Sequence, residues 1–395
     1  MTFSEKIEEW IKEAETRPGS ALMILKLVAG RLRDVTERNE ELLSENIALQ
    51  NGKRVEEYQK RITHLEFQLE MFKRRFGADM KEKLESTGDA AMLNLLVYNA
   101  QGRMFRIAMN SELTVSGASL GKISGEIATG GEFPRLLAIP AGEEALLLFT
   151  TGRISTIPVA NIPMLEAGGN WSWEQAALPD EPHAGELLGC VLPLARLSLA
   201  DFIFQVSRRG SVKKTLISMS ESILSNKYLG KGATQKADHA FDVALCQKKE
   251  RFAVITYEGR VMGLDVDDLS YAAEERIRLD ATDFIVASFV LHKGDALMCL
   301  TQNGKVIQRE ASTLEPAKSG SGRGQAWIPA SRLEQGIRFV GAAAVRLEDM
   351  LVVLGADGSL GVHLMRDLAG AGAIQGGTFL AVGVIPADRT KGALA

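Results

Sequence analysis

Residues 297–306 read LMCLTQNGKV, an apolar run that ends in a polar Asn-Gly turn and resumes with a second strand. Asn-Gly supplies the positive φ angles that tight hairpins require, so the stretch predicts a β-hairpin that turns at Gly304. A related pattern occurs six times between residues 90 and 390, and its turn glycines are Gly102, Gly152, Gly210, Gly259, Gly304 and Gly358. This repeat decides the fold of most of the chain.

The six hairpins are spaced evenly enough to be copies of one structural unit. Successive turn glycines are 50, 58, 49, 45 and 54 residues apart, which suits one four-stranded blade per copy. A further apolar strand precedes every hairpin except the first, and an additional one, 379–384, follows the last. We therefore expect a mainly β, six-bladed propeller-like disc over residues 90–390. The strand near Leu380 to Val384 is expected to pair with the first blade, because ring closure removes two exposed sheet edges.

Residues 1–85 have the pattern of helices. An amphipathic stretch over 3–16 is interrupted at Pro18-Gly19, and a second helix is expected from about Ala21. From Leu32 to residue 76, apolar positions alternate at spacings of three and four, with Asn39 and Asn46 on the same seam. Such spacing is typical of a coiled coil, and buried asparagines favour two strands. We expect an oligomerisation region that forms a homodimer; an intramolecular hairpin bent at residues 51–52 is the alternative.

Motifs of catalysis, metal binding and membrane insertion are missing from the sequence. The five histidines are scattered, no CxxC pair occurs and no GxxxxGK[ST] loop is present. No run of eighteen apolar residues appears, and the acidic start does not read as a signal peptide. We therefore expect a cytoplasmic, non-enzymatic protein without catalytic residues, metal or cofactor.

Charge is distributed unevenly along the chain. The total is −4, but residues 202–251 contain 10 basic and 4 acidic side chains, whereas residues 86–201 contain 6 basic and 12 acidic ones. One sector of the disc is thus expected to be locally positive and another acidic. The acidic sector contains the insertion 167–183, in which Trp171 and Trp173 form either an exposed partner-binding knob or a cover over a blade edge.

The hairpins resemble the C-terminal domain of DNA gyrase A and of its topoisomerase IV relative, the β-pinwheel. The likeness is clearest at residues 204–216, 252–269 and 297–314, the last followed by the Gly-Arg stretch 320–325. The resemblance implies a six-bladed pinwheel that wraps duplex DNA around a positive rim. Three departures stand out: the family's wrapping box has no clean copy, the breakage-reunion domain is missing, and a basic residue four positions after the turn glycine occurs in only two copies.

Basic residues near the hairpin turns are the candidate DNA ligands. They are Arg103, Arg106, Arg208, Arg209, Lys213, Lys214, Lys227, Lys231, Lys305, Arg309 and Arg323. The resemblance implies sequence-independent contact with double-stranded DNA, by bending, wrapping or bridging, and phosphate contacts need only correctly placed Lys and Arg. We expect these side chains to be exposed enough that replacing 208, 209, 213 and 214 by alanine leaves folding intact. The alternatives are a protein-interaction scaffold, or an accessory component of a topoisomerase that does not itself bind DNA.

Overall fold

The computed structural model describes residues 8, 10–12, 18–50, 93–110, 112–128, 132–229, 238–317 and 322–387. The chain divides into two compact units, Met1–Ser86 and Thr87–Ala395. Among the residues described, no helix has the length and apolar character needed to cross a membrane.

In the first unit the described residues 18–50 form one long helix, α2 (Pro18–Gln50). It begins at the proline, which is favoured in the first turn because it has no N–H to leave unpaired. Leu32, Val35 and Leu42 of the expected seam are 67%, 64% and 49% exposed. The second tract of that seam, from Val55 to Phe76, lies outside the described residues. The coiled-coil homodimer therefore stays a prediction.

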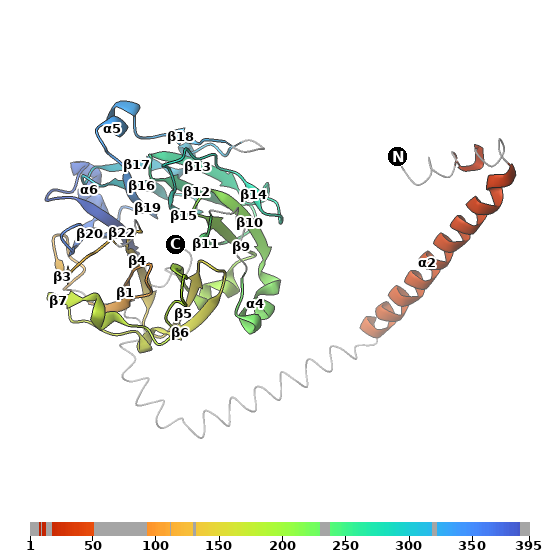
Figure 1. Ribbon diagram of the computed structural model, residues 1–395, viewed down its shortest axis with the longest axis horizontal. Helices are drawn as coiled ribbons and strands as arrows, with labels where there is room; N and C mark the ends of the chain where they lie inside the picture. Colours follow the sequence, from red (N-terminus) through yellow and green to blue (C-terminus); the bar gives the residue numbers. More distant parts are fainter. Residues whose placement is uncertain are drawn as a thin grey trace, which may run out of the picture. The chain divides into compact units, whose positions relative to one another are not determined.

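The described residues of the second unit form six small sheets arranged around a common centre, and the chain passes once around the ring (Figure 1). Each sheet is built on one of the expected hairpins. The hairpins are β1 (Leu93–Tyr98) with β2 (Met104–Met109), β5 (Glu144–Phe149) with β6 (Ile154–Pro158), β9 (Phe202–Ser207) with β10 (Ser211–Leu216), β12 (Arg251–Thr256) with β13 (Arg260–Asp265), β16 (Ala296–Thr301) with β17 (Val306–Glu310), and β20 (Met350–Gly355) with β21 (Ser359–Leu364).

An inner strand pairs with the first strand of each hairpin. The inner strands are β4 (Arg135–Pro140), β8 (Leu188–Pro193), β11 (Ala240–Cys246), β15 (Ile285–Leu291), β19 (Phe339–Val345) and β22 (Phe379–Ile385). Each inner strand follows the hairpin with which it pairs, whereas the sequence pattern was interpreted as a strand that precedes its hairpin. The first hairpin therefore has an inner strand of its own, β4, and the last strand, β22, belongs to the sixth hairpin. Neighbouring inner strands contact one another around the ring, including β22 with β4.

The predicted closure by the C-terminal strand is wrong. β22 pairs with β20 in its own sheet, and β3 (Ser119–Ser124) closes the ring instead by pairing with β21. β7 (Gly169–Ser172) then adds in parallel to β3. Since β3 follows the first hairpin and lies on the last, the two ends of the repeat array are interlocked by main-chain hydrogen bonds.

The same interlock recurs at the outer edge of every hairpin. After each hairpin, a few residues return to the preceding hairpin in the ring and pair at or beside its second strand. We call these residues the covering segment. Besides β3, the pairs are Met164 on Arg106, Tyr228 on Arg153, β14 (Glu274–Glu275) on β10, β18 (Gln325–Ala326) on β13, and Ala373 on Lys305. Each sheet thus has its inner strand at the centre and its covering segment at the perimeter.

Short helices fill the connections between sheets. They are α4 (Ser220–Asn226), α5 (Ala330–Glu334), α6 (Met365–Ala371) and the 3-10 turns Val159–Asn161, Trp173–Ala176, Leu194–Leu199, Ile217–Met219 and Ala311–Thr313. The apolar cores lie between adjacent sheets. One of them, for example, combines Phe204 and Val206 with Phe252 and Val254 of the next hairpin.

The turn glycines are confirmed as the key positions of the repeat. All six have positive φ, between 77° at Gly102 and 90° at Gly152. Covering segments also approach these turns closely: a Cβ at Gly210 would lie 2.7 Å from the carbonyl oxygen of Ile277, and one at Gly259 would lie 2.5 Å from the Cβ of Ile328. Glycine is required there for both reasons, because an L side chain would be strained and would displace the neighbouring segment.

Candidate nucleic-acid interface

The predicted DNA ligands lie mainly on the second strands of hairpins, in the adjoining turns, or in covering segments. Arg103 and Arg106 belong to the β1–β2 hairpin, Lys213 and Lys214 to β10, Lys305 and Arg309 to the β16–β17 hairpin, and Arg323 precedes β18. Lys227 follows α4, while Lys231 lies outside the described residues. None of these positions is on an inner strand, so most of the candidates belong to the outer strands and turns of the ring.

Two of the candidates, Arg208 and Lys214, are buried rather than exposed. Arg208 is 8% exposed, donates to the carbonyl of Ile285 (2.8 Å) and lies 3.3 Å from the carboxylate of Glu132. Burial lowers the pKa of Arg208 to about 10, although Glu132 opposes the change. Lys214 is 5% exposed and its Nζ donates to the carbonyl of Val266 (3.0 Å). The expectation that residues 208, 209, 213 and 214 are all exposed is therefore wrong, because these two cations are buried and bind adjacent segments.

Main-chain carbonyls bind two further candidates. The guanidinium of Arg209 donates to the carbonyls of Asp280 (3.1 Å) and Asp283. Arg106 donates to the carbonyls of Ile162 (3.0 Å) and Ala160 (3.3 Å). In both cases the partner carbonyls follow the next hairpin along the chain, so these arginines reinforce the interlock between sheets.

Carboxylates neutralise two of the more exposed arginines. Arg103 lies 2.8 Å from Glu181, and Arg323 lies 3.4 Å from Asp280. Asp280 also lies 3.9 Å from Arg260 at the turn of the fourth hairpin. Ion pairs of this exposure contribute little to stability, but they reduce the positive potential of the perimeter.

Four candidates remain available to an external anion. Lys213 is half-buried, and Lys227, Lys305 and Arg309 are exposed. Among the described residues, no carboxylate lies within ion-pair distance of these four cations. The guanidinium of Arg309 also stacks over the ring of Trp327, 4.5 Å from its centroid. Charged groups with free donors are the type that phosphate contacts require.

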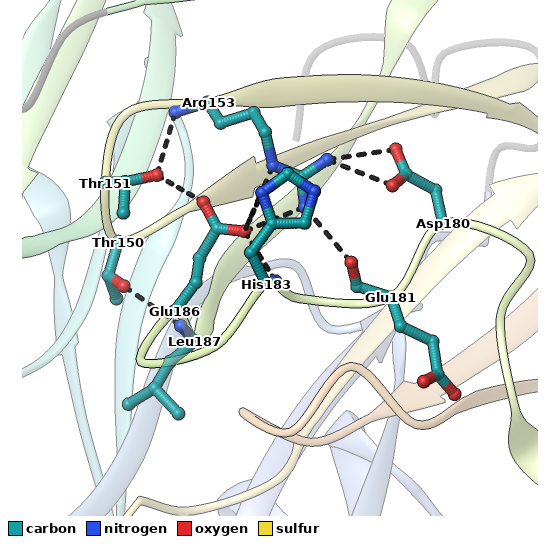
Figure 2. A network of polar contacts seen from close by, with 8 residues as sticks. All are labelled: Thr150, Thr151, Arg153, Asp180, Glu181, His183, Glu186 and Leu187. Atoms are coloured by element: carbon teal, nitrogen blue, oxygen red, sulfur yellow. Dashed lines mark hydrogen bonds and ion pairs between the residues drawn. The ribbon is translucent and has the colours of Figure 1, made fainter.

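The second hairpin contains a polar network that the sequence did not reveal (Figure 2). Arg153 donates to both oxygens of Asp180 (3.0 and 3.1 Å) and, through Nε and Nη2, to Glu186 Oε2 (3.0 and 2.8 Å). Glu186, which is 6% exposed, also accepts from the hydroxyl of Thr151 and the amide of His183. Although burial opposes it, the hydrogen bonds from Arg153 and Thr151 hold the pKa of Glu186 below its ordinary value. The sequence showed a basic residue after the turn glycine, but its acidic partners lie 27 and 33 positions later.

The tryptophans of the same insertion pack against the fold. Trp171 is 5% exposed, donates to the carbonyl of Glu166 (3.1 Å), and its ring centroid lies 5.3 Å from that of Phe105. Trp173 lies 5.6 Å from the same phenylalanine. Of the two interpretations of this segment, the cover over a blade edge is therefore correct.

A partly buried ion pair near the centre was also missed. Arg135 Nη1 lies 3.4 Å from Asp242 Oδ1, and the other oxygen of that carboxylate accepts from the hydroxyl of Ser288 (2.8 Å). These three residues come from different sheets. The signal in the sequence was a single arginine at the start of the apolar run 136–139, and nothing local identified its partner.

Comparison with known proteins identifies the fold. No protein-family model matches the chain, and no curated protein matches it either. Among solved structures, the C-terminal domain of DNA gyrase A is 12% identical, with a TM-score of 0.54 over 74% of this chain and 99% of that one. The C-terminal domain of DNA topoisomerase IV is 17% identical (TM-score 0.49; 75% and 94% covered), and that of E. coli ParC is 12% identical (TM-score 0.32; 75% and 99% covered). The mainly β unit of this chain therefore resembles the C-terminal domain of DNA gyrase A in fold.

Proposed function

We propose that the second unit is a six-bladed β-pinwheel that binds duplex DNA without sequence preference and without catalysing a reaction. The observation that carries the proposal is the set of unpaired perimeter cations, Lys213, Lys227, Lys305 and Arg309, on a fold that resembles the gyrase A C-terminal domain. Arg103 and Arg323 supplement this set once phosphate competes with their carboxylate partners.

The first unit supplies oligomerisation in this proposal. The apolar side chains of α2 at Leu32, Val35 and Leu42 are exposed in the single chain, as the seam of a coiled coil is before it pairs. A homodimer presents two pinwheels to DNA. Linking two weak sites converts the second contact into an intramolecular event and raises the overall affinity.

A protein-interaction scaffold is the second candidate, and ion pairing at the perimeter favours it. Arg103, Arg153 and Arg323 are matched by Glu181, Asp180 and Asp280. Together with a total charge of −4, these pairs leave fewer free cations than the sequence suggested. In this case the partner is a topoisomerase or another protein, and the pinwheel does not contact DNA.

The test compares two triple-lysine variants of the full chain. Lys213→Ala, Lys227→Ala and Lys305→Ala together remove perimeter cations without breaking a described ion pair. The matched control combines Lys248→Ala, Lys249→Ala and Lys293→Ala, three exposed lysines in the connections between one sheet and the next. Each variant loses the same charge, and each contains one lysine with positive φ, Lys227 or Lys249.

Fluorescence anisotropy with a random-sequence duplex at about 50 mM salt measures the difference. At roughly 0.7 kcal/mol per exposed charge contact, the perimeter variant should bind about thirtyfold more weakly. Its salt slope should fall by up to about three units, whereas the control should change little. If wild-type protein does not bind duplex at micromolar concentration, the scaffold function replaces this one; equal losses in both variants would refute the perimeter as the contact surface.

A further inference from the structure

Residues 180–186 connect the turns of the first two hairpins, and we call them the bridging segment. They directly precede the inner strand β8. A Cβ at Gly102 would overlap the ring of Pro182, so the segment lies against the turn of the first hairpin. The carbonyl of Leu187, the next residue, accepts from the amide of Thr150 (2.9 Å) at the turn of the second. The bridging segment is therefore fixed against both turns.

Three carboxylates of the bridging segment face the two arginines that follow these turns. Glu181 lies 2.8 Å from Arg103. Asp180 and Glu186 bind Arg153 from two sides, at 3.0 and 2.8 Å (Figure 2). These five side chains together keep one net negative charge, although both turns contain an arginine. A phosphate group at either turn has to displace a carboxylate before it can bind.

The other hairpins show that this pairing follows the composition of the segment before each inner strand. Arg260, after the fourth turn, lies 3.9 Å from Asp280, which precedes β15. Lys305 occupies the same position after the fifth turn. Residues 335–338 and 373–378 contact that turn through main-chain hydrogen bonds and contain no acidic residue. The acidic residues of these connections therefore decide which turns can accept an external anion.

The two arginines of the acidic sector are held with different strength. Arg153 uses Nε, Nη1 and Nη2 on carboxylates, and one of these, Glu186, is buried and also accepts from Thr151 and from the amide of His183. Arg103 has a single carboxylate partner, Glu181, and the two side chains are 36% and 51% exposed. Arg103 is therefore the cation that becomes most available to phosphate when the negative charge is removed.

We propose that the bridging segment is a built-in competitor of DNA phosphate, which keeps the duplex away from the first two hairpins. The inference rests on the proposed binding of duplex DNA. A carboxylate beside a guanidinium accepts the same charge-assisted hydrogen bonds that a phosphate oxygen would accept. Because it belongs to the same chain, it competes at a high effective concentration. DNA contact is thus restricted to the part of the perimeter that holds Lys213, Lys227, Lys305 and Arg309.

Asp180→Asn combined with Glu181→Gln tests the competition, and we call this double substitution the unmasked variant. It removes two negative charges and keeps the shape of both side chains, while the buried Glu186 continues to hold the segment in place. Glu166→Gln combined with Glu174→Gln is the matched control. Both control residues are exposed, lie in the same connection between β6 and β8, and form no ion pair with a described residue. The two variants change the net charge equally.

Fluorescence anisotropy with a random-sequence duplex measures the affinity of the full chain at salt concentrations from about 50 to about 200 mM. At the lowest salt the unmasked variant should bind roughly tenfold more tightly than wild type, because each of two added charge contacts contributes roughly threefold. Its salt slope should steepen by up to about two units. The control should change the affinity by less than about twofold, since exposed charges away from the contact are largely screened.

Arg103→Gln assigns the gain in affinity to a released arginine. In wild type it should weaken duplex binding by less than about twofold, because Glu181 already occupies Arg103, and in the unmasked variant by roughly threefold. Thermal unfolding of every variant checks that the ring stays folded. An effect of the same size in both backgrounds would refute the proposal, because it would show that Glu181 does not compete for Arg103.

The remaining outcomes separate this proposal from the DNA-binding function itself. If wild type binds duplex and the unmasked variant binds no more tightly than the control, the competition is refuted and DNA binding stands. If none of the proteins binds duplex at micromolar concentration, both proposals fail. Binding by the unmasked variant alone would support the competition and show that the bridging segment suppresses DNA contact in the wild-type chain.

Discussion

Ring closure by β3 makes Gly358 the most informative single position in the chain. Gly358 has φ of +85°, and a Cβ added there would overlap the carbonyl oxygen of Ile123 in β3. The amide of Ile123 donates to the carbonyl of Gly358 (2.9 Å), so the turn and the closing strand are directly joined. Gly358→Ala should therefore strain the turn and push β3 away from the last hairpin.

Gly117→Ala is the matched control for this substitution. Gly117 has nearly the same φ, +86°, but no described atom lies within 4 Å of the Cβ that alanine would add. Both variants incur the cost of a left-handed alanine, about 1 kcal/mol. Only Gly358→Ala also loses a hydrogen bond, about 1 kcal/mol, and incurs an overpacking cost of at least about 1 kcal/mol. We therefore expect the free energy of unfolding to fall by about 1 kcal/mol in Gly117→Ala and by about 3 kcal/mol in Gly358→Ala.

Denaturant unfolding and calorimetry test the difference. A unit of roughly 300 residues has an unfolding entropy of about 0.6 kcal/mol/K, so Tm should fall by about 2 °C for Gly117→Ala and about 5 °C for Gly358→Ala. Hydrogen exchange at the amide of Ile123 should accelerate only in the second variant. Equal losses of stability in the two variants, or unchanged protection of that amide, would refute the closure argument.

Three further predictions concern the buried cations, acid stability and assembly. Arg208→Ala should lower the free energy of unfolding by about 3 kcal/mol because Glu132 loses its partner, whereas Lys213→Ala should change it by less than about 0.5 kcal/mol in the same urea titration; similar effects would contradict the burial of Arg208. The folded-state pKa of Glu186 is lowered, so its stabilising contribution is present above its ordinary pKa and is lost as pH falls through the folded value. The Arg153→Gln variant should therefore be less stable than wild type at pH 7, and the difference should shrink as the pH falls below the ordinary glutamate pKa; a difference that stays constant with pH would show that the ion pair is not the cause. Sedimentation should show a dimer for the full chain and a folded monomer after deletion of residues 1–86, and a monomeric full chain at micromolar concentration would favour the intramolecular hairpin.

The turn chemistry was predictable because it is local. An Asn-Gly or Asp-Gly pair needs positive φ whatever surrounds it, so Gly304 and Gly358 could be assigned from their immediate neighbours. The alternation of apolar runs with these turns likewise predicted the hairpins. The pairing partner of each inner strand was not predictable, since strands on both sides of a hairpin have the same apolar composition.

The candidate site was predicted less well than the fold. Lys213 and Lys214 are adjacent and chemically identical, yet one is half-buried and the other is 5% exposed. Successive residues of a strand point to opposite faces, and only the neighbouring sheet decides which face is covered. The acidic partners of Arg153 were hidden for a similar reason, because they lie in an insertion whose path depends on the rest of the ring.

By itself, the sequence determined that six glycine-turn hairpins form a mainly β unit after a helical segment, because turn conformation and strand alternation depend on near neighbours. Tertiary structure alone decided which strand closes the ring, which basic side chains are neutralised, and which carboxylate lies beside Arg135. Those features depend on contacts between residues far apart in the chain, such as Ile123 with Gly358 and Arg135 with Asp242. Long-range contacts of this kind exist only after the sheets have assembled, so no local pattern encodes them.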